Sequence, residues 1–163
     1  MSFKTPKLPK INENVYEPAE DTFLLLDAIE QEYPQLIHNM PSLCLEIGSG
    51  SGCCITFLAS IFGNECLYFA TDLNKHACKT TIETSILNNT LVNVVNTSFV
   101  DGLLERFRFK VDILLFNPPY VVTGEDELNT KSIEASWAGG LDGRQVIDEF
   151  LPLVDCLLSP KGF

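Results

Sequence analysis

Apolar and polar residues follow one another along the chain in blocks that predict strands and helices in alternation. Four short apolar runs have the length and composition of buried strands, and they lie at residues 43–47, 66–71, 91–99 and 111–116. Apolar residues at helical spacing predict helices at residues 15–29, 53–62, 75–87 and 145–158. This alternation is typical of an α/β fold, with a doubly wound and mainly parallel sheet whose ligand crevice lies at the carboxyl ends of the strands.

Prolines and lysines set the expected boundaries of the folded part. Residues 1–14 contain three lysines and two prolines with little apolar periodicity, so we expect a flexible lead-in followed by one domain over residues 15–163. A loop is expected at residues 34–41, which begins and ends with proline. Pro152 lies inside the last predicted helix and should kink or divide it.

Charge and cysteine content narrow the class of partner and the compartment. The net charge of -11 opposes broad binding to phosphate backbones, so a nucleic-acid partner is not expected. No apolar run approaches the ~18 residues of a membrane span, and no apolar segment of a secretory signal follows the basic N-terminus. The six cysteines form no CxxC pair, so no zinc or other metal site is expected. Without a secretory signal they are expected to be reduced thiols of an intracellular protein, for which the cytoplasm is the expected compartment and the nucleus a further candidate.

A glycine-rich turn at residues 48–52 joins a predicted strand to a predicted helix, as in nucleotide-binding folds. A dinucleotide fingerprint would place its third glycine at Cys53, and the lysine of a phosphate-binding loop is missing, so phosphate binding is not supported. Glu46 near the end of the first strand suits a cationic or hydroxyl-bearing ligand, and Asp72 follows the second strand where an acid binds ribose hydroxyls. Each acid alone could be a solvated residue or a helix cap, but the combination predicts a nucleoside site.

The motif Asn117, Pro118, Pro119 and Tyr120 follows the fourth apolar run. Two successive prolines remove two backbone donors, so the turn offers carbonyl acceptors beside the Asn117 amide. A planar NH2 group could donate to the Asn117 side-chain oxygen and to the Pro118 carbonyl while Tyr120 covers its face. The alternative is a proline-rich loop after a buried strand, with Tyr120 packed against the protein.

Two further segments could border such a site. The connection over residues 121–143 contains Trp137 among glycines and is long enough to form a substrate rim, although Trp137 could also pack the loop down. Residues 16–22 could cover a bound ligand, whereas a helix that packs over the sheet is the alternative for the same residues.

These motifs together resemble the S-adenosylmethionine-dependent class I methyltransferases, and within them the HemK-like eukaryotic release-factor glutamine methyltransferases. The resemblance covers residues 15–163. It is carried by the segments LCLEIGSGSG at 43–52, VYEPAEDTF at 15–23, NPPY at 117–120 and WAGG at 137–140, together with Asp72. The NPPY motif is shared with adenine methyltransferases, whereas the first and last of the flanking segments, 15–23 and 137–140, look specific to the release-factor group.

The resemblance implies N5-methylation of the glutamine in a Gly-Gly-Gln motif of a class I termination factor, with S-adenosylmethionine as the methyl donor. Positions matched to cofactor binding are Thr22, Glu46, Gly48, Gly50, Asp72, Leu73, Ser98, Phe99 and Asn117. Catalytic roles are implied for Asn117, Pro118 and Tyr120, and substrate contacts for these three with Pro119 and Trp137. The family usually has an acid near the adenine where this chain has Ser98, a side chain that can still donate or accept a hydrogen bond.

The family also implies a small zinc-binding adaptor subunit that pairs along a sheet edge, for which residues 91–99 are the candidate. Its sheet has seven strands, and this sequence reaches the position where the fifth should begin, so we expect the fourth strand to be open on one side. Alternatives within the resemblance are an adenine N6-methyltransferase acting on DNA or RNA, a protein lysine methyltransferase, and an inactive short form that binds the adaptor.

Overall fold

A parallel four-stranded sheet in the order β3-β2-β1-β4 forms the centre of the computed structural model, which describes residues 3–124 and 133–163. The strands are β1 (Leu43–Ile47), β2 (Leu67–Asp72), β3 (Asn93–Asn96) and β4 (Ile113–Phe116). Every pairing between neighbouring strands is parallel, with β3 and β4 at the two edges. The predicted α/β fold with a mainly parallel sheet is therefore confirmed.

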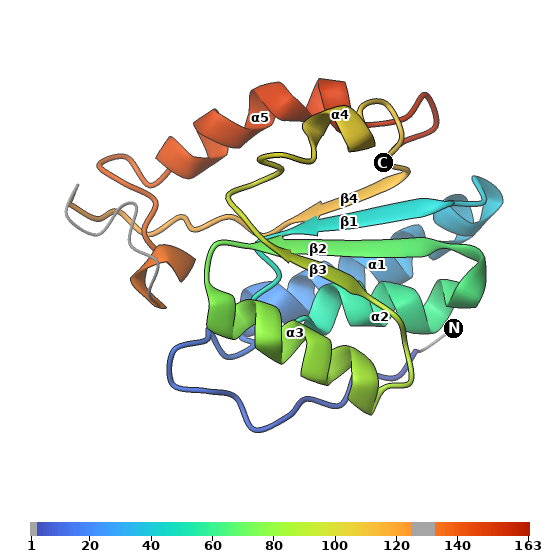
Figure 1. Ribbon diagram of the computed structural model, residues 1–163, viewed down its shortest axis with the longest axis horizontal. Helices are drawn as coiled ribbons and strands as arrows, with labels where there is room; N and C mark the ends of the chain where they lie inside the picture. The colour runs from blue at the N-terminus through green and yellow to red at the C-terminus, as the bar shows by residue number, and fades with distance from the viewer. Residues whose placement is uncertain (1–2, 125–132) are drawn as a thin grey trace.

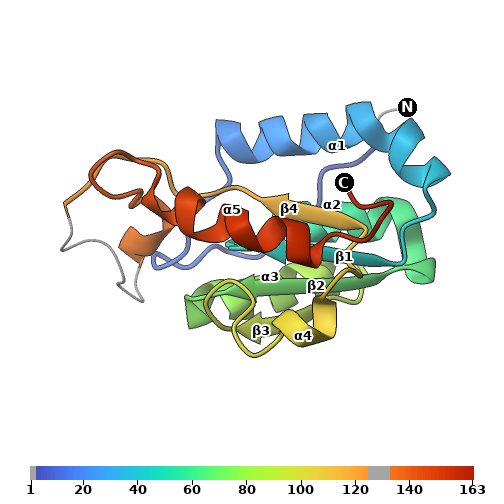
Figure 2. The same ribbon diagram turned by 90° about the horizontal axis from the view of Figure 1, so that it is seen from above.

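Helices cover both faces of the sheet, which gives three layers (Figure 1). They are α1 (Glu20–His38), α2 (Cys53–Phe62), α3 (Lys75–Leu87), α4 (Leu104–Phe107) and α5 (Gln145–Leu157), with short 3-10 turns η1 (Gly63–Glu65) and η3 (Ile133–Ser136). Helices α1, α2 and α3 lie on one face, while α4 and α5 lie on the other, as Figure 1 shows; Figure 2 looks down onto the side of α5. Alternate residues of β1 supply the two cores, with Cys44 packed toward α2 and Leu45 toward α5.

The strand register brings two loops together at one edge of the sheet. Ile47, the last residue of β1, is paired with Phe116, the last residue of β4. Gly48 and Asn117 therefore begin neighbouring loops at the carboxyl ends of adjacent strands. The strand order also reverses at β1. From β1 the chain adds β2 and then β3 on one side, and it then returns to add β4 on the other side of β1. Ligands of α/β sheets bind at such a reversal.

Several element boundaries differ from the sequence-based expectation. Helix α1 begins later than predicted and continues through Pro34 to His38, where a loop was expected. Burial explains the difference, because Leu36 is 2% exposed in the core and outweighs one lost backbone hydrogen bond. Strand β3 is shorter than the predicted 91–99, and α5 continues past Pro152 as one helix.

Residues 3–14, which the sequence analysis expects to be a flexible lead-in, run along the helices of one face. The Phe3 ring lies 4.8 Å from Tyr33 and 6.1 Å from Phe57 between ring centroids, and the Phe3 amide donates to Glu30. Farther along, the Lys7 amide donates to the Asn88 side chain. The aromatic contact supplies apolar burial that the lysine-rich composition of this segment does not suggest.

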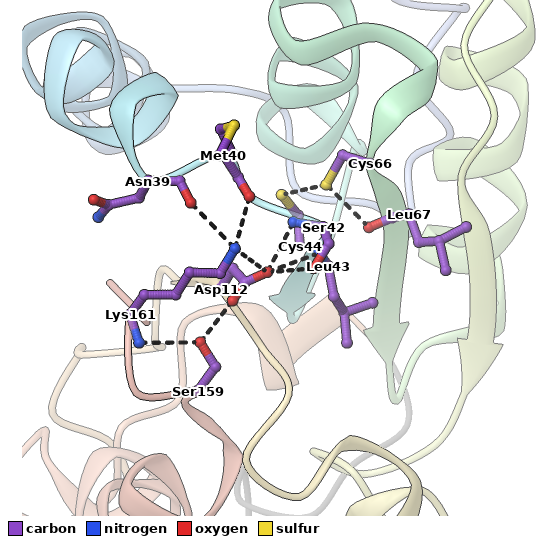
Figure 3. A network of polar contacts seen from close by, with 10 residues as sticks. All are labelled: Asn39, Met40, Ser42, Leu43, Cys44, Cys66, Leu67, Asp112, Ser159 and Lys161. Atoms are coloured by element: carbon purple, nitrogen blue, oxygen red, sulfur yellow. Dashed lines mark hydrogen bonds and ion pairs between the residues drawn. The ribbon is translucent and has the colours of Figure 1, made fainter.

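The far end of the sheet, opposite the two loops, is held by the buried carboxylate of Asp112 (Figure 3). It accepts from the Ser42 hydroxyl at 2.6 Å and from the Ser159 hydroxyl at 2.6 Å, while Lys161 lies 3.6 Å away. Burial alone would raise the pKa of Asp112, but these hydrogen bonds keep that pKa below its usual value. Asp112 thus ties the starts of β1 and β4 to the C-terminal segment.

That C-terminal segment also pairs with β4, which the sequence analysis expects to be open on one side. The Phe163 amide donates to the Asp112 carbonyl at 3.0 Å, and the Leu114 amide donates to the Phe163 carbonyl at 2.9 Å. This is the pattern of a parallel strand pair at its first residue. Within the described residues, no helix has the length and apolar character needed to cross a bilayer.

Candidate active site

The glycine turn after β1 can adopt its shape only because three of its residues lack side chains. Gly48, Gly50 and Gly52 all have positive φ, at 68°, 52° and 74°. A Cβ on Gly48 or Gly50 would meet nothing within 4 Å, whereas one on Gly52 would lie 2.6 Å from Thr81 Cα of α3. The first two glycines therefore give a ligand access to the backbone, and the third allows the turn to pack on α3.

Two acids anchor this turn from the ends of β1 and β2. The Asp72 carboxylate accepts from the backbone amides of Gly50 at 2.9 Å and Asn74 at 2.8 Å. Glu46 is 4% exposed and accepts from the Ile55 amide at 2.9 Å. Burial raises the pKa of Glu46 to about 8, with a smaller contribution in the same direction from the Asp72 charge, and burial also raises the pKa of Asp72. Both carboxyl groups would gain from a positively charged or hydroxyl-bearing ligand.

Residues 117–120, which follow β4 and are called the proline corner below, meet the first turn of α1. Asn117 Nδ2 donates to Asp21 Oδ2 at 3.0 Å, which joins residues 96 positions apart in the sequence. The other oxygen of Asp21 accepts from the Thr22 amide at 2.8 Å. Tyr16 lies beside this group, with its hydroxyl 3.4 Å from Asp21 Oδ1, and burial followed by the Asp21 charge raises the pKa of Tyr16.

A cavity lies between these loops, and most of the predicted site residues line it. From the sequence-based set it contains Thr22, Glu46, Gly48, Gly50, Asp72, Leu73, Ser98, Phe99, Asn117, Pro118 and Pro119. Its acidic lining residues are Asp21, Glu46, Asp72 and Glu149, and no lysine, arginine or histidine of the described residues lines it. The electrostatic character of the cavity therefore favours a cation and disfavours a phosphate group.

Phe99 closes the end of the cavity near β3 in an unusual backbone conformation. Its φ is 44°, a left-handed value that costs free energy for a residue with a side chain. Its ring packs 5.3 Å from Phe150 and 6.4 Å from Phe116 between centroids, and Phe150 is 1% exposed. These aromatic contacts hold Phe99 and the preceding Ser98 at the cavity wall.

Two predicted residues lie outside the cavity lining. The Tyr120 side chain is 56% exposed, and Trp137 is half-buried. Their backbones are nevertheless joined, because the Val121 amide donates to the Trp137 carbonyl at 2.9 Å. The backbone at Trp137 is thus tied to the residue that follows Tyr120. Residues 125–132 of the same connection lie outside the described residues.

Sequence reasoning missed part of the lining. Tyr16, Asp21 and Cys54 line the cavity, as do Gln145, Val146 and Glu149 from the first turns of α5. Tyr16 and Asp21 belong to the segment 16–22 that was expected to cover a ligand, but neither is singled out there; the position of Asp21 directly before Thr22 is the one sequence signal that points to it. The residues of α5 enter the site through the tertiary packing of that helix, which no local pattern reveals.

Comparisons with known proteins agree with this site. No protein-family profile matches the chain. The chain is 53% identical over 149 residues to a Homo sapiens protein named Methyltransferase HEMK2, a match that covers 91% of this chain and 69% of that protein. It is 41% identical over 164 residues to a Schizosaccharomyces pombe protein named eRF1 methyltransferase catalytic subunit mtq2, covering 92% of this chain and 70% of that protein.

Among solved structures, a ribosomal protein L11 methylase from Lactobacillus delbrueckii subsp. bulgaricus matches with a TM-score of 0.56 at 18% identity, over 91% of this chain and 60% of that one. A likeness at this identity shows a shared fold alone. The curated relatives show more, because they are far more similar in sequence and the matched region, more than nine-tenths of this chain, covers the glycine turn, the proline corner and the strands between them. The chain belongs to the HemK-like family of class I methyltransferases.

Proposed function

We propose that this protein transfers a methyl group from S-adenosylmethionine to the side-chain nitrogen N5 of glutamine, in the Gly-Gly-Gln motif of a eukaryotic class I release factor. The observation that carries the proposal is the contact between the proline corner and an acid-lined cavity at the tips of β1 and β4. The relative named as an eRF1 methyltransferase subunit supports the choice of substrate.

The residues of the cavity fit this cofactor. Glu46 is buried without a cation among the described residues, and the ammonium group of the cofactor's methionine part would compensate its charge. Asp72 would accept from the ribose hydroxyls. Thr71, whose buried hydroxyl has no partner among the described residues, offers a further hydrogen bond in the same lining. Gly48 leaves room for close approach to the backbone.

The protein's task in this reaction is to orient a poor nucleophile. An amide nitrogen is unreactive because its lone pair is delocalised, and S-adenosylmethionine, when bound, supplies an electrophilic methyl group on a sulfonium sulfur. Asn117 Oδ1 and the Pro118 carbonyl would accept the two N–H bonds of the substrate amide and fix its direction. No general base is required before transfer, because the nitrogen carries its extra proton only once the new N–C bond has formed and the S–CH3 bond has broken, and that proton can then pass to water.

Adenine N6 is the second acceptor that the proline corner could hold, since an exocyclic NH2 group also has two donors. The net charge of -11 and the absence of basic side chains from the described cavity lining both count against a polynucleotide. An adenine-containing oligonucleotide is therefore expected not to compete with a Gly-Gly-Gln protein for methylation.

We propose a small zinc-binding adaptor as the protein's partner, seated along the edge strand β3. Large apolar side chains flank this edge, and the most exposed are Leu91 at 75%, Ile86 at 66% and Leu67 at 59%. Unpaired edge strands beside exposed apolar residues favour pairing with another chain. The adaptor would cover both the backbone edge and this apolar surface.

The function is tested by methyl transfer to a purified release factor, with the adaptor present. The wild-type chain should methylate the glutamine of the Gly-Gly-Gln motif, and changing that glutamine to alanine should abolish the signal. Asn117→Ala should abolish detectable transfer while the dissociation constant for S-adenosylmethionine, measured by calorimetry, rises by less than about tenfold, since only one of several cofactor contacts is lost. Equal turnover by this variant would contradict the role of Asn117.

A further inference from the structure

The amide of Asn117 must present its oxygen, and not its nitrogen, to a substrate NH2 group. The two ends of an asparagine amide have nearly the same shape, so something in the protein has to select one orientation. Among the hydrogen bonds of the described residues, Asn117 Nδ2 donates to Asp21 Oδ2, and Asn117 Oδ1 has no partner. The free acceptor is therefore the end of the amide that the chemistry requires.

Asp21 is suited to this selection because a carboxylate accepts hydrogen bonds and cannot donate them. A flipped Asn117 would place its oxygen against the Asp21 oxygen, which gives repulsion where the observed orientation gives a hydrogen bond. Because the acceptor is charged, the bond is stronger than one between neutral groups. No basic side chain of the described residues lines the cavity that could compete for this carboxylate.

The Asp21 carboxylate is itself fixed in direction. Its Oδ1 atom accepts from the Thr22 amide at 2.8 Å in the first turn of α1, and the Tyr16 hydroxyl lies 3.4 Å from the same atom. That leaves Oδ2 directed at Asn117. The first turn of α1 thus reaches across the site to a loop 96 residues away in sequence.

We propose that Asp21 is a positioning residue for methyl transfer, which holds the Asn117 amide in the one orientation that accepts the substrate NH2 group. The inference rests on the proposed function for its kinetic consequence, but the hydrogen bond that it describes can be measured without any substrate. Asp21 acts through Asn117 and is not proposed to touch the reacting nitrogen.

The kinetic test compares two variants of different severity. Asp21→Ala removes the acceptor and should lower kcat by about tenfold to a hundredfold, the range for losing a hydrogen bond to a charged group. The KM for the release factor and the dissociation constant for S-adenosylmethionine should stay within about twofold, because positioning acts on the reacting geometry rather than on uniform binding. Asp21→Asn keeps one acceptor and should fall between Ala and wild type.

Asp27→Asn is the matched control, since Asp27 is exposed on the same helix and should leave every constant unchanged. The proposal is overturned if Asp21→Ala keeps the wild-type kcat, if its loss lies wholly in KM or cofactor affinity, or if Asp21→Asn is no better than Asp21→Ala. A wild-type chain that methylates no release factor would count against the proposed function. A second experiment, which observes the Asn117 side chain by NMR, would then decide the inference about Asp21 alone.

The second arm observes the Asn117 side-chain NH2 group directly by nitrogen-15 NMR of the wild-type chain. The signal is assigned by its disappearance in Asn117→Ala. It should move toward the position of a solvent-exposed amide in Asp21→Ala and stay in place in Asp27→Asn. An Asn117 signal that is the same in Asp21→Ala as in wild type overturns the inference, whatever the kinetics show. If Asp21→Ala fails to fold, Asp21→Asn gives the same reading, because its neutral acceptor must also shift the signal.

Discussion

Glu46 shows how a single residue can link folding to cofactor binding. Its side chain is nearly inaccessible, and its hydrogen bond from the Ile55 amide only partly offsets the loss of hydration. Because burial raises its pKa from 4.5 to about 8, the folded protein without ligand holds a proton on Glu46 at pH values where the unfolded chain has released it. A bound cation would reverse this preference.

The raised pKa predicts a specific dependence of stability on pH. Between about pH 4.5 and pH 8 the folded state binds more protons than the unfolded state, so the free energy of unfolding should fall as pH rises through this window. At about 1.4 kcal/mol per pKa unit, the total fall is on the order of a few kcal/mol. Glu46→Gln, which stays neutral, should lack that contribution and be more stable than wild type at pH 8.

Urea titrations at pH 5 and pH 8 measure both chains. Glu65→Gln, which replaces an exposed acid in η1, serves as control and should retain the wild-type dependence. The same Glu46→Gln variant should bind S-adenosylmethionine more weakly despite its greater stability, because the carboxylate that would face the cation is gone. A variant with unchanged affinity and an unchanged pH slope would show that Glu46 is not coupled to either process.

At the residue scale, the sequence identified groups whose role follows from their own chemistry. The positive-φ glycines, the acids at strand ends and the Asn-Pro-Pro turn each have a local signature. Asp21 has only its place beside Thr22, because its importance lies in a hydrogen bond to Asn117 that exists only after the chain has folded. The same holds for Glu149, which α5 brings to the cavity wall.

At the scale of elements, the glycine turn and α3 form one packed unit. Ser49 Oγ lies 2.8 Å from Thr81 Oγ1, and the Thr84 hydroxyl donates to the Ser51 carbonyl at 2.7 Å. Both threonines are buried on the face of α3 that meets the turn. The threonines at these α3 positions are therefore polar partners of the turn's backbone and side chains, which explains why the helix has few large apolar residues.

This packing predicts that two glycines of the same turn respond differently to alanine. Gly48→Ala should lower the free energy of unfolding by about 1–2 kcal/mol, because the only penalty is that of a residue with a side chain in the left-handed backbone conformation. Gly52→Ala meets the same cost and also forces Thr81 of α3 away, which together amount to about 2–5 kcal/mol. Thermal unfolding of the two variants without ligand should show the larger loss for Gly52→Ala, and equal losses would contradict the close contact with α3.

Element boundaries were predictable where a local signal ends the element and were missed where packing decides. Helices α2 and α3 were predicted with their observed bounds, because glycine precedes the first and two asparagines follow the second. Helix α1 exceeds its prediction because Leu36 and its neighbours pack on the core beyond Pro34. Strand β3 falls short because no other strand among the described residues pairs with its outer edge.

At the scale of the whole molecule, the protein is acidic, and the described residues that line the cavity include no basic side chain. Acids outnumber bases by 22 to 11, and the cavity lining repeats that imbalance. A protein substrate with a neutral glutamine can approach such a surface at little electrostatic cost, whereas a polynucleotide would meet repulsion along its backbone. The molecule therefore favours a peptide loop over a base flipped from a duplex.

The second feature of the whole molecule is the exposed edge of the sheet at β3, and it makes the adaptor proposal testable. Ile86→Glu on α3 and Leu91→Lys beside β3 each place a charge on exposed apolar surface, so the fold should tolerate both changes. If the adaptor covers this surface, each should weaken the complex by about tenfold or more, since burying an unpaired charge at an interface is costly. Leu151→Glu is the matched control, because Leu151 is likewise an exposed apolar residue, at 56%, but lies on α5, which covers the opposite face of the sheet (Figure 1). Calorimetric titration of the adaptor into each chain gives the comparison, and a complex weakened only by Leu151→Glu would move the interface to the α5 face.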